Sequence, residues 1–333
     1  MLKSQYFFLT IVIFLFFAAV FYEYSTPWNS NKNGHWSMKV NKSGYSNVLT
    51  NAPFPESFGV GLYESPEYGH GGTNSKVFKV NGTFEKYLFV ANAINKSNEY
   101  LIFALVDYKQ IPFYVDGKLN LTHLIKLKPM EYRFLKIKVE NLSEGYHDLF
   151  VGVFLDPYNH NLSDMYRLST DFSRMGGVRI QVISNRPIYK LPNFTHPPIS
   201  CGKDDMDGIL VTKSPCEYKA WLRENFSENI KYYINIGNKH ENLRTFALVA
   251  MLNYRQITIT NDTLVYYGYV YKNQDVAIPA ELKMHKSSDE VQEFVVIYFP
   301  DPFLPLQFPP DVRNINLLIE PEPSIRIAIL PNR

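Results

Sequence analysis

The chain has 333 residues, of which 46% are hydrophobic and 20% charged, a composition that suits buried cores and excludes wholesale disorder. Its 34 Lys and Arg against 32 Asp and Glu give a formal net charge of +2. Because phosphate neutralisation requires a basic surface, this balance argues against a nucleic-acid partner. Aromatic residues make up 15% of the chain, and since aromatic and β-branched side chains favour strands, the composition predicts a mostly β protein.

The N-terminal segment predicts a single-pass membrane anchor. Residues 6–22 form an uncharged run of apolar and aromatic side chains behind Lys3, and a helix of that length spans about 25 Å, near the lower limit for a bilayer. The alternative is a cleaved signal peptide and a secreted protein, but Ala18 and Ala19 lack a small residue two positions before them. The positive charge that precedes the segment places the N-terminus inside the cell and the rest of the chain outside.

Nine N-x-S/T sequons agree with export and glycosylation. This number is about three times what the Asn, Ser and Thr content gives by chance, and an Asn-rich surface without glycans is the alternative. The predicted glycan acceptors are Asn41, Asn81, Asn95, Asn120, Asn141, Asn161, Asn193, Asn225 and Asn261.

The two cysteines predict one disulfide. Cys201 and Cys216 enclose a short polar loop, and closing a loop of about 15 residues contributes about 3 kcal/mol on the chain-entropy model. A disulfide agrees with an oxidising, extracellular compartment, and the sequence contains no C-x-x-C motif of a redox or zinc site.

An internal repeat divides the chain into two tandem copies. Three separate segments recur in the same order, at offsets of 146, 145 and 147 residues, which coincidence does not explain. The recurring segments are ALVDYKQIPF at 104–113 with AMLNYRQITI at 250–259, EGYHDLFVGVFLDPY at 144–158 with DEVQEFVVIYFPDPF at 289–303, and VRIQVISNRP at 178–187 with IRIAILPNR at 325–333.

We therefore predict three parts: a signal-anchor at 1–24, a first domain with an N-terminal extension at 25–187, and a second domain at 188–333. The second domain begins with a Pro-rich linker and holds the disulfide loop. Within each copy, short stretches alternate apolar and polar residues between turn signals, as at residues 132–139 (YRFLKIKV). This spacing predicts two antiparallel β-sandwich domains.

The run GYHDL at residues 145–149, ahead of a valine-rich strand, resembles the E–F corner of prokaryotic immunoglobulin-like or fibronectin-like cell-surface modules. The resemblance covers about 100 residues of each copy. The second copy departs from it with Glu290, Val291 and Gln292, and the paired cysteines and core Trp of antibody domains are missing. The resemblance implies a spacer, an adhesin or a binding scaffold.

One helix is expected, at residues 214–222. Ser214 and Glu217 fit a capping box with Pro215 at the first helical position, and apolar residues follow at helical spacing up to Trp221. The helix would begin at the disulfide and be held by it.

Two short segments are the most alike parts of the copies: DYKQ at 107–110 and NYRQ at 253–256. The interpretation we favour is a strand-end turn, in which Asp or Asn bonds the local backbone, Tyr packs and the cation faces water. A polar ligand platform presented twice is the alternative.

The loops between the last two strands of each copy, at 156–177 and 301–323, are long enough to suggest a function. Exposed aromatic side chains on such loops stack on sugars or partner proteins, or fold back over a sheet edge. The candidate ligand contacts are Tyr158, Tyr166, Phe303 and Phe308.

The sequence contains no catalytic, cofactor-binding or metal-binding motif. The glycine run at 69–72 has no G-x-S-x-G nucleophile elbow to accompany it, and Asp204, Asp205 and Asp207 miss the EF-hand spacing. We therefore expect a non-enzymatic, membrane-anchored extracellular protein of tandem Ig-like modules that acts in surface binding, display or adhesion, without a cofactor, toward a cell-surface protein or glycan. The alternatives are an extracellular hydrolase of envelope polysaccharide or peptide, whose carboxylates the fold would gather, and a structural envelope spacer.

Overall fold

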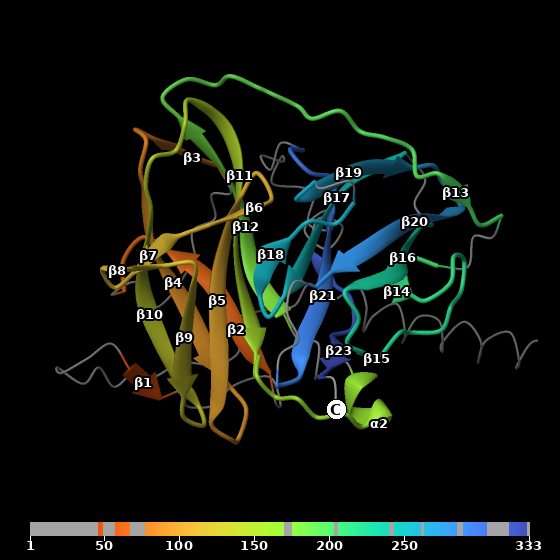
Figure 1. Ribbon diagram of the computed structural model, residues 1–333. Helices are drawn as coiled ribbons and strands as arrows, with labels where there is room; N and C mark the ends of the chain where they lie inside the picture. The colour runs from red at the N-terminus through yellow and green to blue at the C-terminus, as the bar shows by residue number, and fades with distance from the viewer. Residues whose placement is uncertain are drawn as a thin grey trace, which may run out of the picture.

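The computed structural model describes residues 46–48, 57–66, 77–169, 175–202, 206–239, 243–260, 263–284, 289–304 and 320–331. These residues form two β-sandwiches, module 1 and module 2, which lie side by side (Figure 1). Module 1 contains sheets A and B, and module 2 contains sheets C and D. The sheets are stacked in the order A, B, C, D, because B and C each pack on their own partner and on one another.

Module 1 is built almost entirely from antiparallel pairs. Sheet A has the order β2-β4-β10-β7-β8 with β1 also on β10, and sheet B has the order β3-β12-β11-β5-β6 with β9 also on β5. The strands of sheet A are β1 (Ser46–Val48), β2 (Phe58–Tyr63), β4 (Phe84–Asn92), β7 (Phe113–Val115), β8 (Lys118–Asn120) and β10 (Glu131–Val139). Those of sheet B are β3 (Val77–Val80), β5 (Asn98–Val106), β6 (Lys109–Ile111), β9 (Thr122–Leu127), β11 (Gly145–Leu155) and β12 (Met175–Ser184).

Module 2 repeats this plan. Sheet D has the order β13-β20-β16-β14, and sheet C has the order β15-β23-β21-β17-β18 with β19 on β17 and β22 on β21. The strands of sheet D are β13 (Ile199–Ser200), β14 (Gly208–Thr212), β16 (Asn229–Asn238) and β20 (Gln274–Lys283). Those of sheet C are β15 (Arg223–Asn225), β17 (Arg244–Leu252), β18 (Arg255–Ile257), β19 (Val265–Val270), β21 (Gln292–Pro300), β22 (Glu322–Pro323) and β23 (Ile327–Leu330).

Each module has a core of its own between its two sheets. In module 1 the alternation seen in the sequence turns Leu135, Ile137 and Val139 of β10 inward, where they are at most 4% exposed. In module 2 the equivalent strand β20 turns Ile278 and Leu282 inward in the same way. The prediction of a mostly β protein built as a β-sandwich is confirmed.

The two copies differ at one sheet edge. In module 1 the β7–β8 hairpin covers part of β10, and Asp116 Oδ1 accepts the Lys136 N–H at 2.8 Å. In the described part of module 2 no hairpin lies on the equivalent edge of β20. On this edge β13 pairs with Val276 and Ala277 of β20 and does not extend to Pro279. Met284 N donates to Glu228 O on the β16 side, so by alternation the backbone nitrogen of Pro279 faces the β13 side, where proline has no N–H to leave unpaired.

The linker between β12 and β13 is docked on both modules. Tyr146 N donates to Ile188 O at 3.0 Å, and the Tyr146 and Tyr189 rings stack with centroids 3.9 Å apart. Further along, Thr195 N donates to Tyr267 O at 3.1 Å on β19. The Pro-rich linker therefore contacts module 1 at one end and module 2 at the other.

The prediction of a helix at residues 214–222 is wrong. Cys216 adopts a left-handed φ of 57°, and its N–H donates to Asn235 Oδ1 at 2.8 Å instead of entering a helical ladder. Trp221 N donates to Val211 O, so this part of the chain is tied to β14. A left-handed residue inside the first turn is incompatible with an α-helix, and tertiary contacts override the local capping signal.

One short helix, α2 (Asp164–Arg167), is present in the described part of the chain. No helix among the described residues is long and apolar enough to cross a membrane. Residues 1–24, on which the anchor prediction rests, lie outside the described ranges.

Candidate functional site

Sheets B and C meet face to face and bury an apolar interface between the modules. Alternate side chains of β5 and β11 point into module 1, and the others point toward β17 and β21 of module 2, which lie beside them in Figure 1. Phe150 and Phe299 meet across this contact with ring centroids 5.2 Å apart. The interface side chains, each at most 1% exposed, include Leu101, Phe103, Leu105, Phe150 and Phe154 from module 1 and Ala247, Val249, Met251, Val295, Ile297 and Phe299 from module 2.

The two most similar segments of the sequence meet each other across this interface. Gln110 N donates to Gln256 Oε1 at 2.6 Å, and Gln256 N donates to Gln110 Oε1 at 2.8 Å. Gln110 Nε2 donates to Tyr254 O at 3.0 Å, and Gln256 Nε2 donates to Tyr108 O at 2.9 Å. The four bonds form two reciprocal pairs, as in a dimer with a two-fold axis.

The turn interpretation of these segments agrees with the structure. Asp107 and Tyr108 have φ values of 50° and 64°, and Asn253 and Tyr254 have values of 47° and 62°. Both tyrosines are 1% exposed, and burial raises the pKa of Tyr254 to about 12. Because the tyrosines and glutamines are used in the contact between modules, these turns offer no polar platform to a ligand.

Two arginines, one from each module, also form hydrogen bonds with the opposite module. Arg179 of module 1 donates from Nη1 to Pro300 O and from Nη2 to Asp301 O, both at 2.7 Å. Arg326 of module 2 donates from Nη1 to Asp156 O at 3.0 Å and to Pro157 O at 3.1 Å. Each guanidinium thus satisfies backbone oxygens of the opposite module where a β-strand ends.

The loops that leave β11 and β21 cross the interface as arms. Arm 1 is residues 156–169 and includes α2; arm 2 is residues 301–304. The fully buried Arg167 of arm 1 donates to Glu293 Oε1 at 3.0 Å and to Glu293 Oε2 at 3.2 Å, and His160 Nδ1 lies 3.0 Å from the same carboxylate. In return, Phe303 N of arm 2 donates to Asp148 Oδ2 at 2.9 Å.

Arg167 and Glu293 were not expected from the sequence. The available signal was the recurrence of an acid, Asp148 and Glu293, and of a base, Arg179 and Arg326, at the repeat offset inside apolar strands. A buried charge in a strand requires a partner, so these four residues indicated a second contact surface.

The predicted ligand contacts are distributed over the two arms. Tyr158 of arm 1 is 49% exposed and has one edge on Tyr254, with ring centroids 6.0 Å apart. Tyr166 accepts a hydrogen bond at Oη from Asn159 Nδ2 at 2.6 Å. Phe303 of arm 2 packs against the interface tyrosine of module 1, and Phe308 lies outside the described residues. Tyr158 is the described candidate that keeps half of its surface free.

One group has the residue types of a hydrolytic triad. Asp107 Oδ2 lies 2.7 Å from His147 Nδ1, and Ser143 Oγ lies 3.3 Å from His147 Nε2. However, Nε2 is closer, at 2.9 Å, to the backbone oxygen of Ser143, which accepts only, so this nitrogen carries a proton. The hydrogen bond to Asp107 raises the pKa of His147 above its usual value. Because both ring nitrogens are engaged, with Asp107 and with the Ser143 carbonyl oxygen, His147 ties the turn together and presents no free nitrogen as a base for Ser143.

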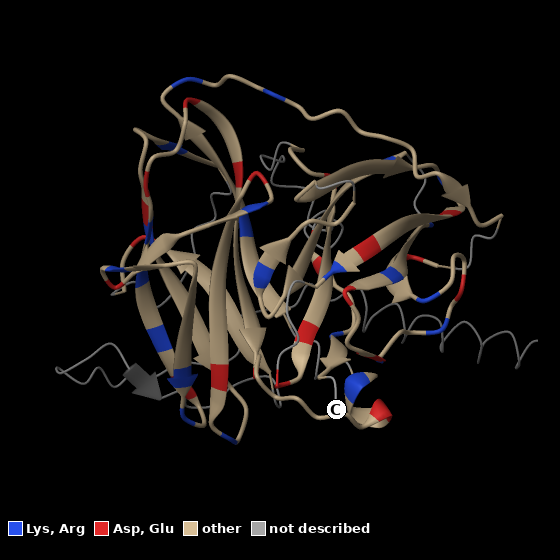
Figure 2. Cartoon of the chain, in the orientation of Figure 1, with Lys and Arg blue, Asp and Glu red and all other residues tan. Residues whose placement is uncertain are grey.

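A shallow groove opens on each module away from the interface. Groove 1 has a volume of about 520 Å³ and lies between β8, β9 and β10, and groove 2 has a volume of about 570 Å³ and lies beside β16 and β20. Both are lined by mixed polar and apolar side chains. Figure 2 shows charges of both signs interspersed over the two modules.

The predicted disulfide is confirmed. Cys201 and Cys216 are bonded, with their Cα atoms 5.2 Å apart. Among the residues that the structure describes, no three His, Cys, Asp or Glu side chains gather as a metal site would require. The glycine run at 69–72 and the residues Asp204 and Asp205 lie outside the described ranges.

All of the sequon asparagines that the structure describes are exposed. Asn41 and Asn261 lie outside the described residues; the exposed acceptors are Asn81, Asn95, Asn120, Asn141, Asn161, Asn193 and Asn225. By contrast, the buried asparagines Asn92, Asn98, Asn235 and Asn238 belong to no sequon. The geometry therefore allows a glycan at every described acceptor.

No protein-family model matches the sequence, and no curated protein sequence matches it. Among solved structures, the chain is similar to a CARDB domain from Pyrococcus furiosus, solved with di-metal ions, at 16% identity and a TM-score of 0.24, covering 38% of this chain and 89% of that one. It is similar to the Escherichia coli chaperone DraB at 12% identity and a TM-score of 0.23, covering 84% and 98%.

A third similar structure is the CsuC–CsuE chaperone and tip-adhesion subunit complex of Acinetobacter baumannii, at 11% identity and a TM-score of 0.21, covering 78% and 96%. These neighbours are Ig-like β-sandwich modules, and the chain shares that resemblance. At such scores the likeness carries no information on ligand or activity.

Proposed function

We propose that this protein is a membrane-anchored, extracellular glycoprotein whose two Ig-like modules act in surface binding or adhesion without catalysing a reaction. The observation that carries the proposal is the exposed apolar tip of arm 1. Tyr158 is 49% exposed, Met165 85% and Leu168 53%. Exposed apolar side chains on an ordered loop are typical of a contact with a partner.

Buried contacts with module 2 hold the tip of arm 1 in place. Arg167, in the same short helix, is fully buried and bonds Glu293 and the Arg326 carbonyl oxygen. On the outer side, Arg223 Nη2 donates to Asp164 Oδ1 at 2.6 Å. A loop anchored at both sides loses little conformational entropy when its exposed face is covered, which favours binding.

The described polar clusters support a non-enzymatic role because each is used in folding. The reciprocal glutamines and arginines join the modules, and His147 holds a turn through Asp107 and the Ser143 carbonyl oxygen. Export is supported by the disulfide, the exposed sequon asparagines and the apolar segment at residues 6–22.

The test is co-sedimentation of residues 25–333 with isolated cell envelopes, before and after the envelopes are digested with protease. Binding that survives digestion indicates a glycan or polymer receptor, and binding that is lost indicates a protein receptor. The double variant M165S/L168S should lose binding. The control is L191S, because Leu191 is an equally exposed apolar residue, 63% accessible, on the linker. Absence of binding by the unaltered protein would overturn the proposal.

A structural envelope spacer is a second candidate, and the buried contact between the modules favours it. A spacer requires a fixed distance between its ends, and two sandwiches joined by an apolar interface form one rigid unit. In that case the protein would fail to bind isolated envelopes but would be cross-linked to a fixed neighbour in intact cells.

A further inference from the structure

Groove 1 lies beside one of the predicted glycan acceptors. Asn120 lines the groove from β8, and Thr122, the third residue of the same sequon, lines it from the start of β9. The attachment atom for a glycan is therefore at the wall of a concavity. Asn81 and Asn95 differ from it, because they lie in exposed connections between strands.

The groove has both kinds of surface that a sugar ring needs. Leu124, 50% exposed, supplies apolar contact for the C–H face of a ring. Lys118 and Arg133 supply donors, and Asp116 supplies an acceptor, for its hydroxyl groups. A concave site with apolar walls and a few polar groups is typical of small-ligand sites, and about 520 Å³ lies within their usual range.

We propose that the N-linked glycan on Asn120 lies in groove 1, packed over Leu124, instead of extending into solvent. This inference rests on the proposed export and glycosylation of the protein. A covalent tether at the wall supplies a millimolar effective concentration, so contacts too weak to hold a free saccharide suffice to hold the attached one. The glycan then shields an apolar side chain at the open side of the sandwich.

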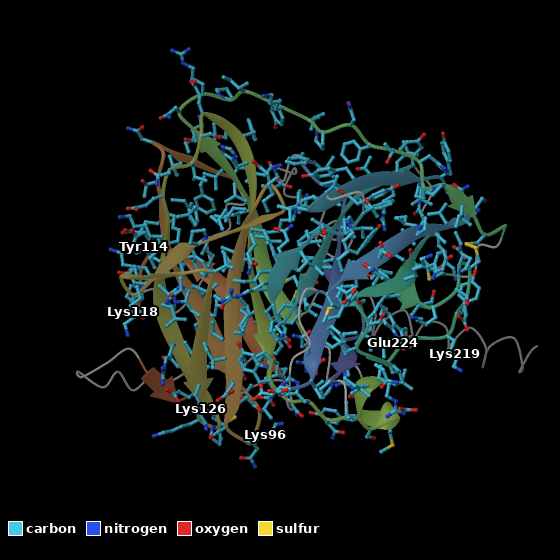
Figure 3. The ribbon with its side chains drawn as sticks, in the orientation of Figure 1. Lys96, Tyr114, Lys118, Lys126, Lys219 and Glu224 are labelled. Carbon is cyan, nitrogen blue, oxygen red and sulfur yellow. A yellow bond between two sulfur atoms is a disulfide. The ribbon has the colours of Figure 1, made fainter. Side chains whose placement is uncertain are left out.

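The test uses the full-length protein produced in a host that N-glycosylates exported chains. Glycopeptide mass spectrometry first measures which sequons are occupied. The accessibility of Lys118 is then measured by labelling with an amine-reactive reagent under native conditions. Lys126 is the internal reference, because it is exposed on β9 but does not line the groove; Figure 3 shows Lys118 at the left of module 1 and Lys126 towards the bottom of the same module.

We expect Lys118 to be labelled several-fold faster in N120Q than in the unaltered protein, with the rate at Lys126 unchanged. N95Q, which removes a glycan from an open turn, should leave Lys118 protected. T122S retains the sequon and should also retain the protection, whereas T122A should behave like N120Q.

Three results would overturn the inference or its basis, and they are distinguishable. An occupied Asn120 with equal labelling of Lys118 in the unaltered protein and N120Q would show that the glycan points into solvent. An empty Asn120 beside occupied acceptors elsewhere would refute the inference and leave the glycoprotein proposal standing. Empty sequons throughout would refute both.

Discussion

At the scale of single residues, the two modules place different side chains at one equivalent position near the start of β11 and β21. In module 1 the position holds His147, bonded to Asp107 of the neighbouring turn and to the Ser143 carbonyl oxygen. In module 2 the corresponding residues are Gln292 and Asn253, which carry no charge. On the neighbouring strand β12, His147 lies opposite Val182, which does not titrate. The Asp107 carboxylate is therefore the charged group that raises the pKa of His147. Module 1 therefore responds to pH at a place where module 2 does not.

This difference gives a prediction for stability against pH. The pKa of His147 is raised in the folded protein, so the proton stabilises the fold fully below the unfolded value of about 6.5, and that stabilisation is lost as pH rises through the raised value. The unaltered protein should therefore lose stability between about pH 6 and about pH 8.5. The variant D107N/H147Q, which copies module 2, should lose less over this window. Denaturant unfolding at both pH values measures the effect, and equal slopes for the two proteins would contradict it.

The buried pair of Arg167 and Glu293 gives a second prediction at this scale. R167M leaves the Glu293 carboxylate buried beside a single histidine, so we expect destabilisation of about 3–5 kcal/mol. Adding E293Q should recover a large part of this loss, because the unpaired charge is removed. The control is R186A, whose 79% exposed side chain pairs with Glu144 and should cost about 0–1 kcal/mol. Chemical denaturation would show the prediction to be wrong if R167M and R186A unfold at the same midpoint.

At the scale of strands, the most informative residue is Pro279, on the part of the β20 edge that β13 does not pair with. An uncovered edge can pair with another chain, and proline removes the donor that such pairing uses. In module 1 the equivalent donor, Lys136 N–H, is covered by Asp116. The two modules thus protect the same edge by different means, one with a side-chain acceptor and the other with Pro279.

Pro279→Val should therefore promote association through this edge, because it restores a donor and adds a β-branched side chain. We expect concentration-dependent dimers or larger species in size-exclusion chromatography with light scattering. Tyr233→Val is the matched control, because it places the same side chain on the neighbouring strand β16 at a residue that is paired on both sides, with Thr212 and with Pro279. If both variants stay monomeric to the same extent, the protective role of Pro279 is refuted.

At the scale of the whole molecule, the interface and not the linker holds the modules together. A protease site introduced at Lys190, which is exposed in the linker, allows the chain to be cut between them. We expect the two halves to co-elute after cleavage, because the apolar faces of sheets B and C stay buried against each other. Cleavage of the F299D variant should release separate halves, because it introduces an unpaired charge into the interface. Separation of the unaltered halves after cleavage would contradict this account.

The sequence predicted the strand-rich class, the sandwich and the disulfide, because alternation and cysteine spacing are local signals. It failed at residues 214–222, where a helix-capping pattern was overridden by the bond from Cys216 to Asn235. The interface was missed although its signal was present: YLIFALV at 100–106 and FALVAML at 246–252 are continuously apolar. A continuous run indicates burial on both faces of a sheet, but it does not say what covers the second face. In the structure each copy covers the second face of the other, and no local pattern in the sequence encodes this pairing.

The exchanged arms have a consequence for how long the folded protein persists. Separation of the modules requires arm 1 to withdraw the Arg167 guanidinium from a fully buried site and arm 2 to release Phe303 from Asp148. Both events precede any exposure of the apolar faces, so they raise the activation barrier to opening as well as the equilibrium cost. A slow opening rate limits the time during which proteases can cut the chain. The doubled architecture is thus a means of kinetic persistence, measurable as a long half-life in protease for the unaltered chain and a short one for R167M.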